Sequence, residues 1–327
     1  MTLAPLLEHC LAIAEEAGRA ILKVYGTDFA VTQKEDHSPL TQADLAAHHC
    51  IVGRLGALDP VYPCLSEEAA DIPYETRRQW SRYWLIDPLD GTKEFVRRNG
   101  EFTVNIALID GGEPILGVVH APVLGVSYLA ARGVGAFRIS DGQRQAIHTR
   151  RTAARPTLVV SKSHHDAALD AFLAHAPEHE ALSRGSSLKF CLVAEGSADL
   201  YPRTGPTSEW DTAAGQCVAE QAGASVWTLP DWVPLRYNQK EGLLNPGFIV
   251  IGEPAYGWRD KLKAACANSA PTPRCCAIAP CRCLPTRGNC AASAWAPMAA
   301  TNSWRRRPPT PGRRCARRRP RTAWSCC

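Results

Sequence analysis

The chain has 327 residues, of which 45% are hydrophobic, and a formal net charge of +5. This length can bury one large core or two modest ones, which suits a globular enzyme of one or two domains. The positive net charge does not indicate that the whole chain binds nucleic acid, because the charge is concentrated in residues 264–327, which contain twelve arginines and no acid. Removing those twelve arginines from the net charge of +5 leaves −7 for residues 1–263, so the body of the chain is acidic.

The cysteines are distributed as unevenly as the charge. Nine of the fourteen lie after residue 264, and the body holds an odd number at wide spacings: Cys10, Cys50, Cys64, Cys191 and Cys217. This pattern favours buried, reduced thiols over a disulfide framework. Charged residues such as Glu8 and Glu15 interrupt the N-terminal apolar positions, and no apolar run is long enough to cross a bilayer. We expect a cytoplasmic protein without a transmembrane segment, with peripheral attachment to the cytoplasmic face of the inner membrane as the alternative.

Two helices are predicted in the N-terminal region. Apolar residues recur at helical spacing from Leu3 to Val24, and Gly26 suits a C-cap. The second helix is predicted from Thr41, which can cap it, to about Leu55. Residues 36–39 between these helices predict a turn.

Strand-like runs follow the helices. Four runs separated by short Gly-, Pro- and Asp-containing links predict a mixed or antiparallel sheet, at 83–86, 102–109, 115–120 and 126–130. Beyond residue 155 the pattern alternates between strands at 158–161, 199–202 and 248–251 and helices at 167–175, 188–195 and 212–222. We therefore predict an α+β domain over residues 1–154 and an α/β domain over 155–260.

The remaining segment, 261–327, has no periodicity and is predicted to be disordered. It consists largely of Ala, Pro, Arg and Cys. Three interpretations are a nucleic-acid-binding arm, a metal-binding appendage, and an out-of-frame translation of GC-rich sequence. The absence of acids and the cysteine cluster at 275–283 favour the last, since the cysteine spacing fits no standard zinc knuckle.

Two carboxylates follow the first strand-like run. Asp87 and Asp90 stand three residues apart around Pro88 and precede a short helical run at 93–98. Both can point at one centre, and the Leu89 carbonyl between them can add an oxygen of the kind that Mg²⁺ prefers. The alternative is that both acids only stabilise a turn and cap a helix.

Further positions favour the metal interpretation. Glu67 and Glu68 follow an apolar stretch at 62–65, and Asp211 opens a predicted helix. Acids at several strand ends and helix starts predict a polynuclear metal site. Gly91 and Thr92 open another helix, whose free backbone N–H groups can hold a phosphate.

Three motifs together resemble the inositol monophosphatase superfamily, whose members are magnesium-dependent and lithium-sensitive. They are Ser66-Glu-Glu68, Trp84-Leu-Ile-Asp-Pro-Leu-Asp-Gly-Thr-Lys-Glu-Phe95 and Trp210-Asp-Thr-Ala-Ala-Gly215. The runs at 93–108, 185–191, 201–203 and 244–250 resemble the 3'(2'),5'-bisphosphate nucleotidases of the CysQ type. This resemblance covers about residues 3–252, excludes the tail, and implies a layered α-β-α-β-α sandwich.

The resemblance implies a set of metal ligands and a catalytic set. Two or three Mg²⁺ ions would be bound by the Leu89 carbonyl and the side chains of Glu67, Asp87, Asp90 and Asp211. Asp44 and Thr92 match the family's water-orienting pair, and with Glu67 they form the implied catalytic residues. Without the resemblance, Asp44 would be interpreted as an exposed helix acid. Glu67 aligns with the family's ligand, whereas Glu68 is expected behind the ligands or on the surface, and Li⁺ is expected to inhibit.

The resemblance also implies residues that contact substrate: Glu67, Leu89, Asp90, Gly91, Thr92, Ser161, Ser186, Lys189, Arg203 and Asp211. Cationic side chains at a fixed distance from the metals would favour a bisphosphate over a monophosphate. Taken alone, Lys189 and Arg203 would be interpreted as solvated or paired with acids. His164 and His165 are interpreted as surface histidines and not as metal ligands.

The implied reaction is hydrolysis of adenosine 3',5'-bisphosphate to AMP and phosphate, which would link the protein to sulfate assimilation. The sulfated relative of that nucleotide, which would give adenosine 5'-phosphosulfate, is a second substrate. Inositol monophosphatase and then sugar bisphosphatase activity are the alternatives within the class. A non-catalytic, RNA-associated regulator that uses the arginine-rich tail is the alternative outside it. We expect a nucleotide bisphosphate as partner, no specific nucleic acid, and a monomer or homodimer.

Overall fold

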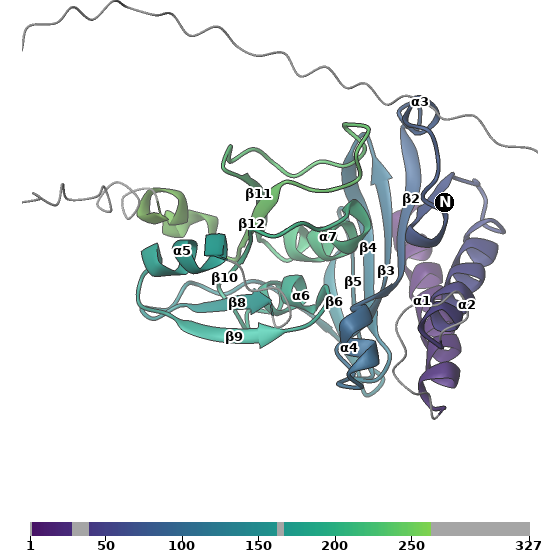
Figure 1. Ribbon diagram of the computed structural model, residues 1–327, viewed down its shortest axis with the longest axis horizontal. Helices are drawn as coiled ribbons and strands as arrows, with labels where there is room; N and C mark the ends of the chain where they lie inside the picture. The colour runs from purple at the N-terminus through teal and green to yellow at the C-terminus, as the bar shows by residue number, and fades with distance from the viewer. Residues whose placement is uncertain (1, 28–38, 162–166, 263–327) are drawn as a thin grey trace, which may run out of the picture. The chain divides into compact units, whose positions relative to one another are not determined.

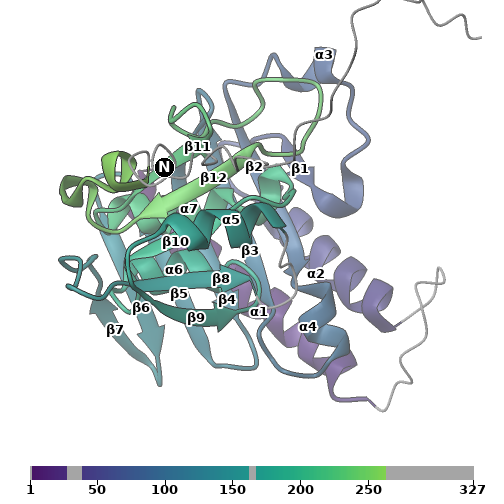
Figure 2. The ribbon, with the colours of Figure 1, turned by 60° about the vertical axis from the view of Figure 1, so that its left-hand side comes forward.

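Two β-sheets and the helices around them make up the computed structural model, which describes residues 2–27, 39–161 and 167–262 (Figures 1 and 2). Helices α1 (Leu3–Tyr25) and α2 (Pro39–Leu55) pack together on one face of the first sheet. Helices α6 (Leu188–Ala194) and α7 (Ala213–Gln221) lie between the two sheets, and α5 (Ala167–His175) packs on the far face of the second. This order of layers confirms the predicted α-β-α-β-α sandwich.

The first sheet has the strand order β1-β2-β3-β4-β5-β6-β7. Only β1 runs parallel to its neighbour, and the remaining pairs are antiparallel, which confirms the predicted mixed or antiparallel sheet. The strands are β1 Cys64–Ser66, β2 Arg82–Asp90, β3 Thr103–Asp110, β4 Glu113–Ala121, β5 Val126–Ala131, β6 Gly135–Ser140 and β7 Gln143–Ala146.

The second sheet has the strand order β11-β12-β10-β8-β9. Strand β12 pairs antiparallel with both neighbours, whereas β10, β8 and β9 run parallel. The strands are β8 Thr157–Ser161, β9 Glu180–Arg184, β10 Leu200–Arg203, β11 Ser225–Leu229 and β12 Gly247–Ile251. The predicted boundary at residues 154 and 155 falls between β7 and β8. Both sheets belong to one compact unit, so the division into two domains stays a prediction.

Strand β2 shows why the central strands have almost continuous apolar sequences. Successive side chains of a strand point to opposite faces. Trp84 and Ile86 pack into the core beneath α1 and α2, whereas Tyr83 and Leu85 pack into the core that α6 and α7 share with the second sheet. A strand that is buried on both faces therefore loses the alternation of a half-exposed strand.

Some predicted elements differ from the structure. Helix α2 begins at Pro39, so Thr41 lies inside its first turn and the predicted Thr41 cap is wrong; proline is favoured at the first helical position. Strands β7 and β9 were not predicted because their side chains are mostly exposed and lack apolar alternation. Of the predicted turn at 36–39, Pro39 is helical and residues 36–38 lie outside the described residues. The disorder predicted from residue 261 is wrong for Lys261 and Leu262, which are helical, with Leu262 buried in a core cluster; the rest of the tail lies outside the described residues.

Two features bear on the expected environment of the protein. Within the described ranges, no helix is long and apolar enough to span a membrane. The body's five cysteines are free. Cys10, Cys191 and Cys217 are buried as predicted, whereas Cys50 and Cys64 are half-buried.

The contact of β4 with α7 fixes the helix that follows Asp211. A Cβ placed on Gly117 would lie 2.5 Å from the Ala214 carbonyl oxygen and 2.8 Å from the Cys217 Cβ. Real side chains do not approach this closely. Helix α7 therefore packs directly on the strand backbone, and this contact sets how far Asp211 stands from the sheet.

We expect Gly117→Ala to lower the free energy of unfolding by about 1–3 kcal/mol, because the added methyl group must displace the α7 backbone. Gly53→Ala is the matched control, since it lies in α2 with nothing within 4 Å of the added Cβ. Alanine there should raise the stability by up to about 1 kcal/mol. Urea denaturation measures both values, and equal stability of the two variants would contradict the close-contact argument.

Candidate active site

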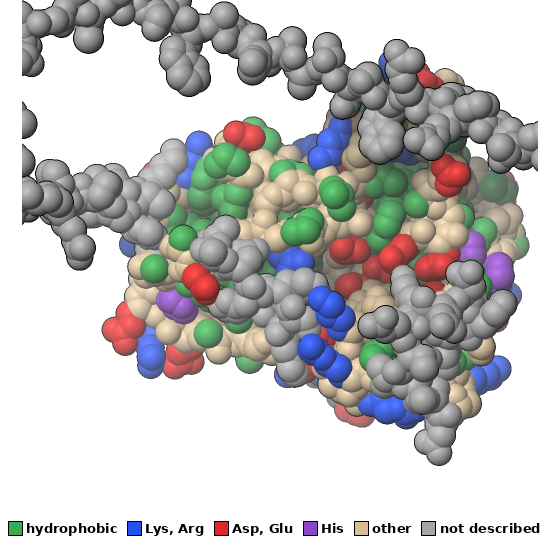
Figure 3. Space-filling view, viewed as in Figure 1, with side chains coloured by type: hydrophobic (Ala, Val, Ile, Leu, Met, Phe, Trp, Pro, Cys, Tyr) green, Lys and Arg blue, Asp and Glu red, His purple; other side chains and the backbone are tan. Residues whose placement is uncertain are grey.

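A cavity of about 310 Å³ lies where β2 ends and where α4 (Thr92–Val96), α6 and the 3-10 turn η2 (Glu209–Asp211) begin. Figure 3 shows acidic side chains gathered on this face with basic side chains beside them. The cavity brings together most of the predicted site residues. Those that line it are Glu67, Asp87, Leu89, Asp90, Gly91, Thr92, Ser186, Lys189, Arg203 and Asp211.

A bulge at the end of β2 directs Asp87 and Asp90 into the same cavity. Residues three positions apart in a regular strand point to opposite faces. Here the register with β3 shifts between Asp87 and Asp90, and the Leu89 N–H donates to Asp87 Oδ1 over 3.0 Å. Bulges re-aim side chains in this way. The segment predicted as a turn is thus the bulged end of a strand.

Gly91 turns the chain from β2 into α4. Its φ is +96°, a conformation that L-residues with a side chain rarely adopt. A Cβ at this position would also lie 3.2 Å from the Phe102 Cα. The turn places Thr92 as the first residue of α4 and on the cavity wall, as predicted.

Three carboxylates form the centre of the site. One oxygen from each of Asp87, Asp90 and Asp211 lies within 4.8 Å of the other two. Burial and then the charge of Glu67 raise the pKa of Asp87 well above its ordinary value. Burial and then Asp90 raise the pKa of Asp211 to about 7. A cation would offset this repulsion, and a donor set made only of oxygens fits a hard cation such as Mg²⁺.

Two other predicted acids lie around this cluster. Glu67 begins the 3-10 turn η1 (Glu67–Ala69) and lines the cavity, whereas the tight cluster consists of the three aspartates. Asp44 projects from α2 and is only 8% exposed. Its charge contributes to the raised pKa of Asp87, so Asp44 lies behind the cluster and is not an exposed helix acid.

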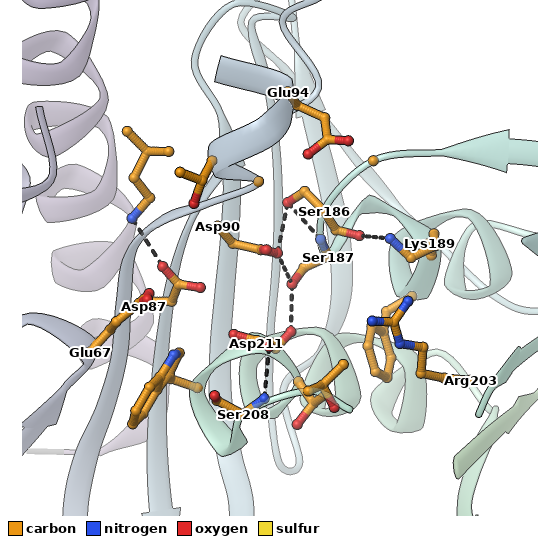
Figure 4. Close-up of a pocket in the computed structure, with 18 of the residues that line it drawn as sticks. Glu67, Asp87, Asp90, Glu94, Ser186, Ser187, Lys189, Arg203, Ser208 and Asp211 are labelled. Carbon is orange, nitrogen blue, oxygen red and sulfur yellow. Dashed lines mark hydrogen bonds between the residues drawn. The ribbon is translucent and has the colours of Figure 1, made fainter. Parts of the chain in front are cut away.

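Hydrogen bonds fix the orientation of Asp90 and Asp211 (Figure 4). The hydroxyls of Ser186 and Ser187 each lie 2.8 Å from Asp90 Oδ2. The Ser208 N–H donates to Asp211 Oδ2 over 2.8 Å. Neither Ser187 nor Ser208 is among the predicted site residues, although Ser187 lies inside the motif at 185–191.

Lys189 and Arg203 form a cationic wall of the cavity. Both are buried, with 6% and 7% of their surface exposed. Burial lowers the Lys189 pKa to about 8. The Lys189 side chain donates hydrogen bonds to the backbone carbonyls of Ser186 and Arg184. The Arg203 side chain donates to the backbone carbonyls of Gly205 and Pro206. In the described part of the chain neither cation pairs with a carboxylate, so the interpretation as solvated or acid-paired residues does not hold.

One part of the predicted substrate site cannot be placed. Strand β8 ends at Ser161, whose side chain lies outside the described residues. His164 and His165 also lie outside them. The contacts predicted for Ser161 therefore stay predictions.

Comparison with known proteins identifies the family of the chain. The model of the inositol monophosphatase family matches residues 2–254. The chain belongs to this family. It is 55% identical over 250 residues to the 3'(2'),5'-bisphosphate nucleotidase CysQ of Escherichia coli (strain K12), and the match covers 75% of this chain and 99% of the relative. CysQ of Salmonella typhimurium (strain LT2) is 53% identical over the same shares of the two chains.

The fold of this family member also matches solved structures. A crystal structure of CysQ from Bacteroides thetaiotaomicron, described as a bacterial member of the inositol monophosphatase family, superposes with a TM-score of 0.71. The identity is 40%, and the match covers 77% of this chain and 99% of that one. These comparisons confirm the resemblance to the superfamily and to the CysQ type.

The raised pKa of Asp211 predicts how the stability of the metal-free protein depends on pH. A carboxyl whose pKa is higher in the folded state stabilises the fold below its unfolded pKa of 3.8, and this stabilisation is lost as the pH rises through about 7. An amide in place of this carboxyl would carry no such charge. In EDTA, we expect the stability of Asp211→Asn relative to wild type to increase from pH 5.5 to pH 8 by about 1 kcal/mol or more.

Urea denaturation at the two pH values gives this difference. Asp141→Asn, at an exposed position outside the cavity, is the control and should show the same relative stability at both. A pH-independent difference for Asp211→Asn would rule out the repulsion described for the cluster.

Proposed function

We propose that this family member is a magnesium-dependent 3'(2'),5'-bisphosphate nucleotidase that hydrolyses adenosine 3',5'-bisphosphate to AMP and phosphate. The observation that carries the proposal is that one cavity is lined by three clustered carboxylates and by two buried cations, neither of which pairs with a carboxylate among the residues that the structure describes. The names of the relatives at 53–55% identity support the same reaction. The sulfated relative of the nucleotide, which would yield adenosine 5'-phosphosulfate, is proposed as a second substrate.

The cavity residues suit the binding of Mg²⁺. Asp87, Asp90 and Asp211 would hold the ions, with Glu67 and the Leu89 carbonyl as further oxygens. We propose two or three ions, and inhibition by Li⁺. When bound, Mg²⁺ supplies a Lewis acid that makes water more acidic and offsets negative charge on phosphoryl oxygens.

The chain's own residues have separate tasks in this proposal. Thr92 lines the cavity at the start of α4, and Asp44 is buried behind the carboxylate cluster. We assign them the orientation of the attacking water. The backbone from Leu89 to Thr92 would hold the phosphate that is cleaved, since backbone N–H groups at a helix start point toward an anion.

The second phosphate distinguishes this substrate from a monophosphate. Lys189 and Arg203 are held by backbone carbonyls on the cavity wall, so their positive charge is available to an anionic ligand. A phosphate bound there would form charge-assisted hydrogen bonds that a monoester cannot form. Binding inositol 1-phosphate would leave both buried cations unpaired, which is costly.

Several broader properties are part of the proposal. The five free thiols suit a reducing compartment, and we propose a cytoplasmic location. We also propose a monomer or homodimer. The family match ends at residue 254, so the tail is given no part in the reaction.

We expect adenosine 3',5'-bisphosphate to be hydrolysed with a kcat/KM at least about 100-fold above that of inositol 1-phosphate, because a site with buried polar groups rejects a ligand that leaves them unpaired. Adenosine 3'-phosphate, which lacks only the second phosphate, is the matched comparison and should also be a poor substrate. Phosphate release with Mg²⁺, with and without Li⁺, measures these rates. Preference for inositol 1-phosphate would contradict the proposed substrate. No phosphate release from any of the three compounds would contradict the proposed phosphatase activity.

Asp90→Asn should reduce kcat by more than about 100-fold, since loss of the groups that merely support a metal ligand already costs 10–100-fold. The fold should be retained, because the substitution removes one charge from a repelling cluster, and circular dichroism checks this. Asp141→Asn, outside the cavity, should keep the wild-type rate. Substantial activity in Asp90→Asn would remove the metal role assigned to Asp90.

A further inference from the structure

The Ser187 hydroxyl lies between two of the segments that carry the metal-binding carboxylates. Its oxygen is 2.8 Å from Asp90 Oδ2 and 2.7 Å from the backbone carbonyl oxygen of Asp211 (Figure 4). The Asn105 side-chain amide donates to the same hydroxyl over 2.9 Å. Only 2% of Ser187 is exposed. The hydroxyl thus touches β3, the end of β2 and η2 at one point.

The position of Ser187 in its helix does not explain this arrangement. Ser187 is the N-cap residue of α6, where a serine side chain commonly accepts a bond from the backbone of the first turn. Here the side chain makes no capping hydrogen bond. Since the hydroxyl accepts from Asn105, its single hydrogen is shared between the Asp90 carboxylate and the Asp211 carbonyl. The side chain therefore serves the carboxylate site and not the helix.

The donors around Asp90 all approach one of its two oxygens. Ser186 and Ser187 lie 2.8 Å from Oδ2, and the Asn105 amide nitrogen lies 3.4 Å from it. Within the described ranges, no hydrogen bond reaches Asp90 Oδ1. This one-sided set of donors fixes the carboxylate plane and leaves Oδ1 for a cation.

We propose that Ser187, supported by Asn105, is a positioning residue of the metal site that orients the Asp90 carboxylate and ties it to the Asp211 segment. This inference rests on the proposed metal-dependent function. Ser187 acts through Asp90 and contacts neither the cation nor the substrate. Its loss therefore weakens metal binding and leaves the affinity for nucleotide at saturating metal unchanged.

Calorimetric titration of metal-free protein with Mg²⁺ tests the proposal directly. Ser187→Ala should raise the Kd for Mg²⁺ by about 10-fold or more, as is typical when a group that supports a metal ligand is removed. The KM for adenosine 3',5'-bisphosphate at saturating Mg²⁺ should stay within about twofold of wild type. Asn105→Ala should raise the Kd severalfold. The increase in Kd for Mg²⁺ in the double variant should be smaller than the product of the two single increases, because both residues act on one oxygen of Asp90.

Ser127→Ala is the matched control. Ser127 is also 2% exposed and hydrogen-bonded to a side chain, His120 Nδ1 at 2.8 Å, but it does not line the cavity. Its Kd for Mg²⁺ should equal that of wild type. Thermal unfolding in EDTA checks that each variant is folded, and Asn105→Ala carries the test if Ser187→Ala is not.

The outcomes separate this inference from the proposed function. A wild-type Kd for Mg²⁺ in Ser187→Ala overturns the positioning role. A raised nucleotide KM with unchanged metal affinity also overturns it, since Ser187 would then contact substrate. If wild-type protein itself binds no Mg²⁺, the metal site and the proposed function fail together.

Discussion

Three carboxylates, one buried and two half-buried, lie within 4.8 Å of one another and repel one another, and the surrounding structure holds them together despite that repulsion. The β2 bulge, the Gly91 turn and the packing of α7 on Gly117 hold Asp87, Asp90 and Asp211 where free side chains would move apart. The three carboxylates stay close together only because several backbone contacts hold the segments that carry them. A cation of suitable size converts the repulsion into binding energy.

The opposite wall of the cavity carries the complementary charge. Lys189 belongs to α6, between the sheets, and Arg203 ends β10 of the second sheet, while Asp87 and Asp90 belong to the first sheet. Within the described residues, neither cation forms an ion pair with a carboxylate, although the charge of Arg203 lowers the pKa of Asp211 against the effect of burial. If the carboxylates hold metal ions, a ligand with negative charge at two places, one near those ions and one near Lys189 and Arg203, would fit this division better than a ligand with one phosphate.

The sequence predicted the chemistry of the site better than its geometry. Asp87, Asp90 and Asp211 could be predicted to lie together because acids recur at several element boundaries and because the family motifs contain all three. The β2 bulge could not be predicted, because Asp-Pro-Leu-Asp suits a turn equally well. The role proposed for Ser187 could not be predicted for a similar reason. A serine before a helix is ordinarily a cap, and only the structure shows that the Ser187 hydroxyl makes no capping hydrogen bond.

The layers of the fold were predictable for a different reason. Central strands such as β3 are buried on both faces, so their apolar runs are long and distinct. Edge strands such as β7 are exposed along their whole length and carry no comparable signal. Helix α5 was placed at its observed bounds, whereas the start of α2 depended on residues at and before Pro39 that resemble a turn.

The segments that Ser187 bridges are synthesised at different times. Asp87 and Asp90 leave the ribosome long before Ser187 and Asp211 do. Until the later segment docks, the two early carboxylates can remain hydrated, which weakens their mutual repulsion. Asp211, the third carboxylate of the cluster, joins Asp87 and Asp90 only when η2 and α7 dock on the first sheet. The nascent chain can therefore pair the strands of the first sheet before the cluster of three carboxylates is complete.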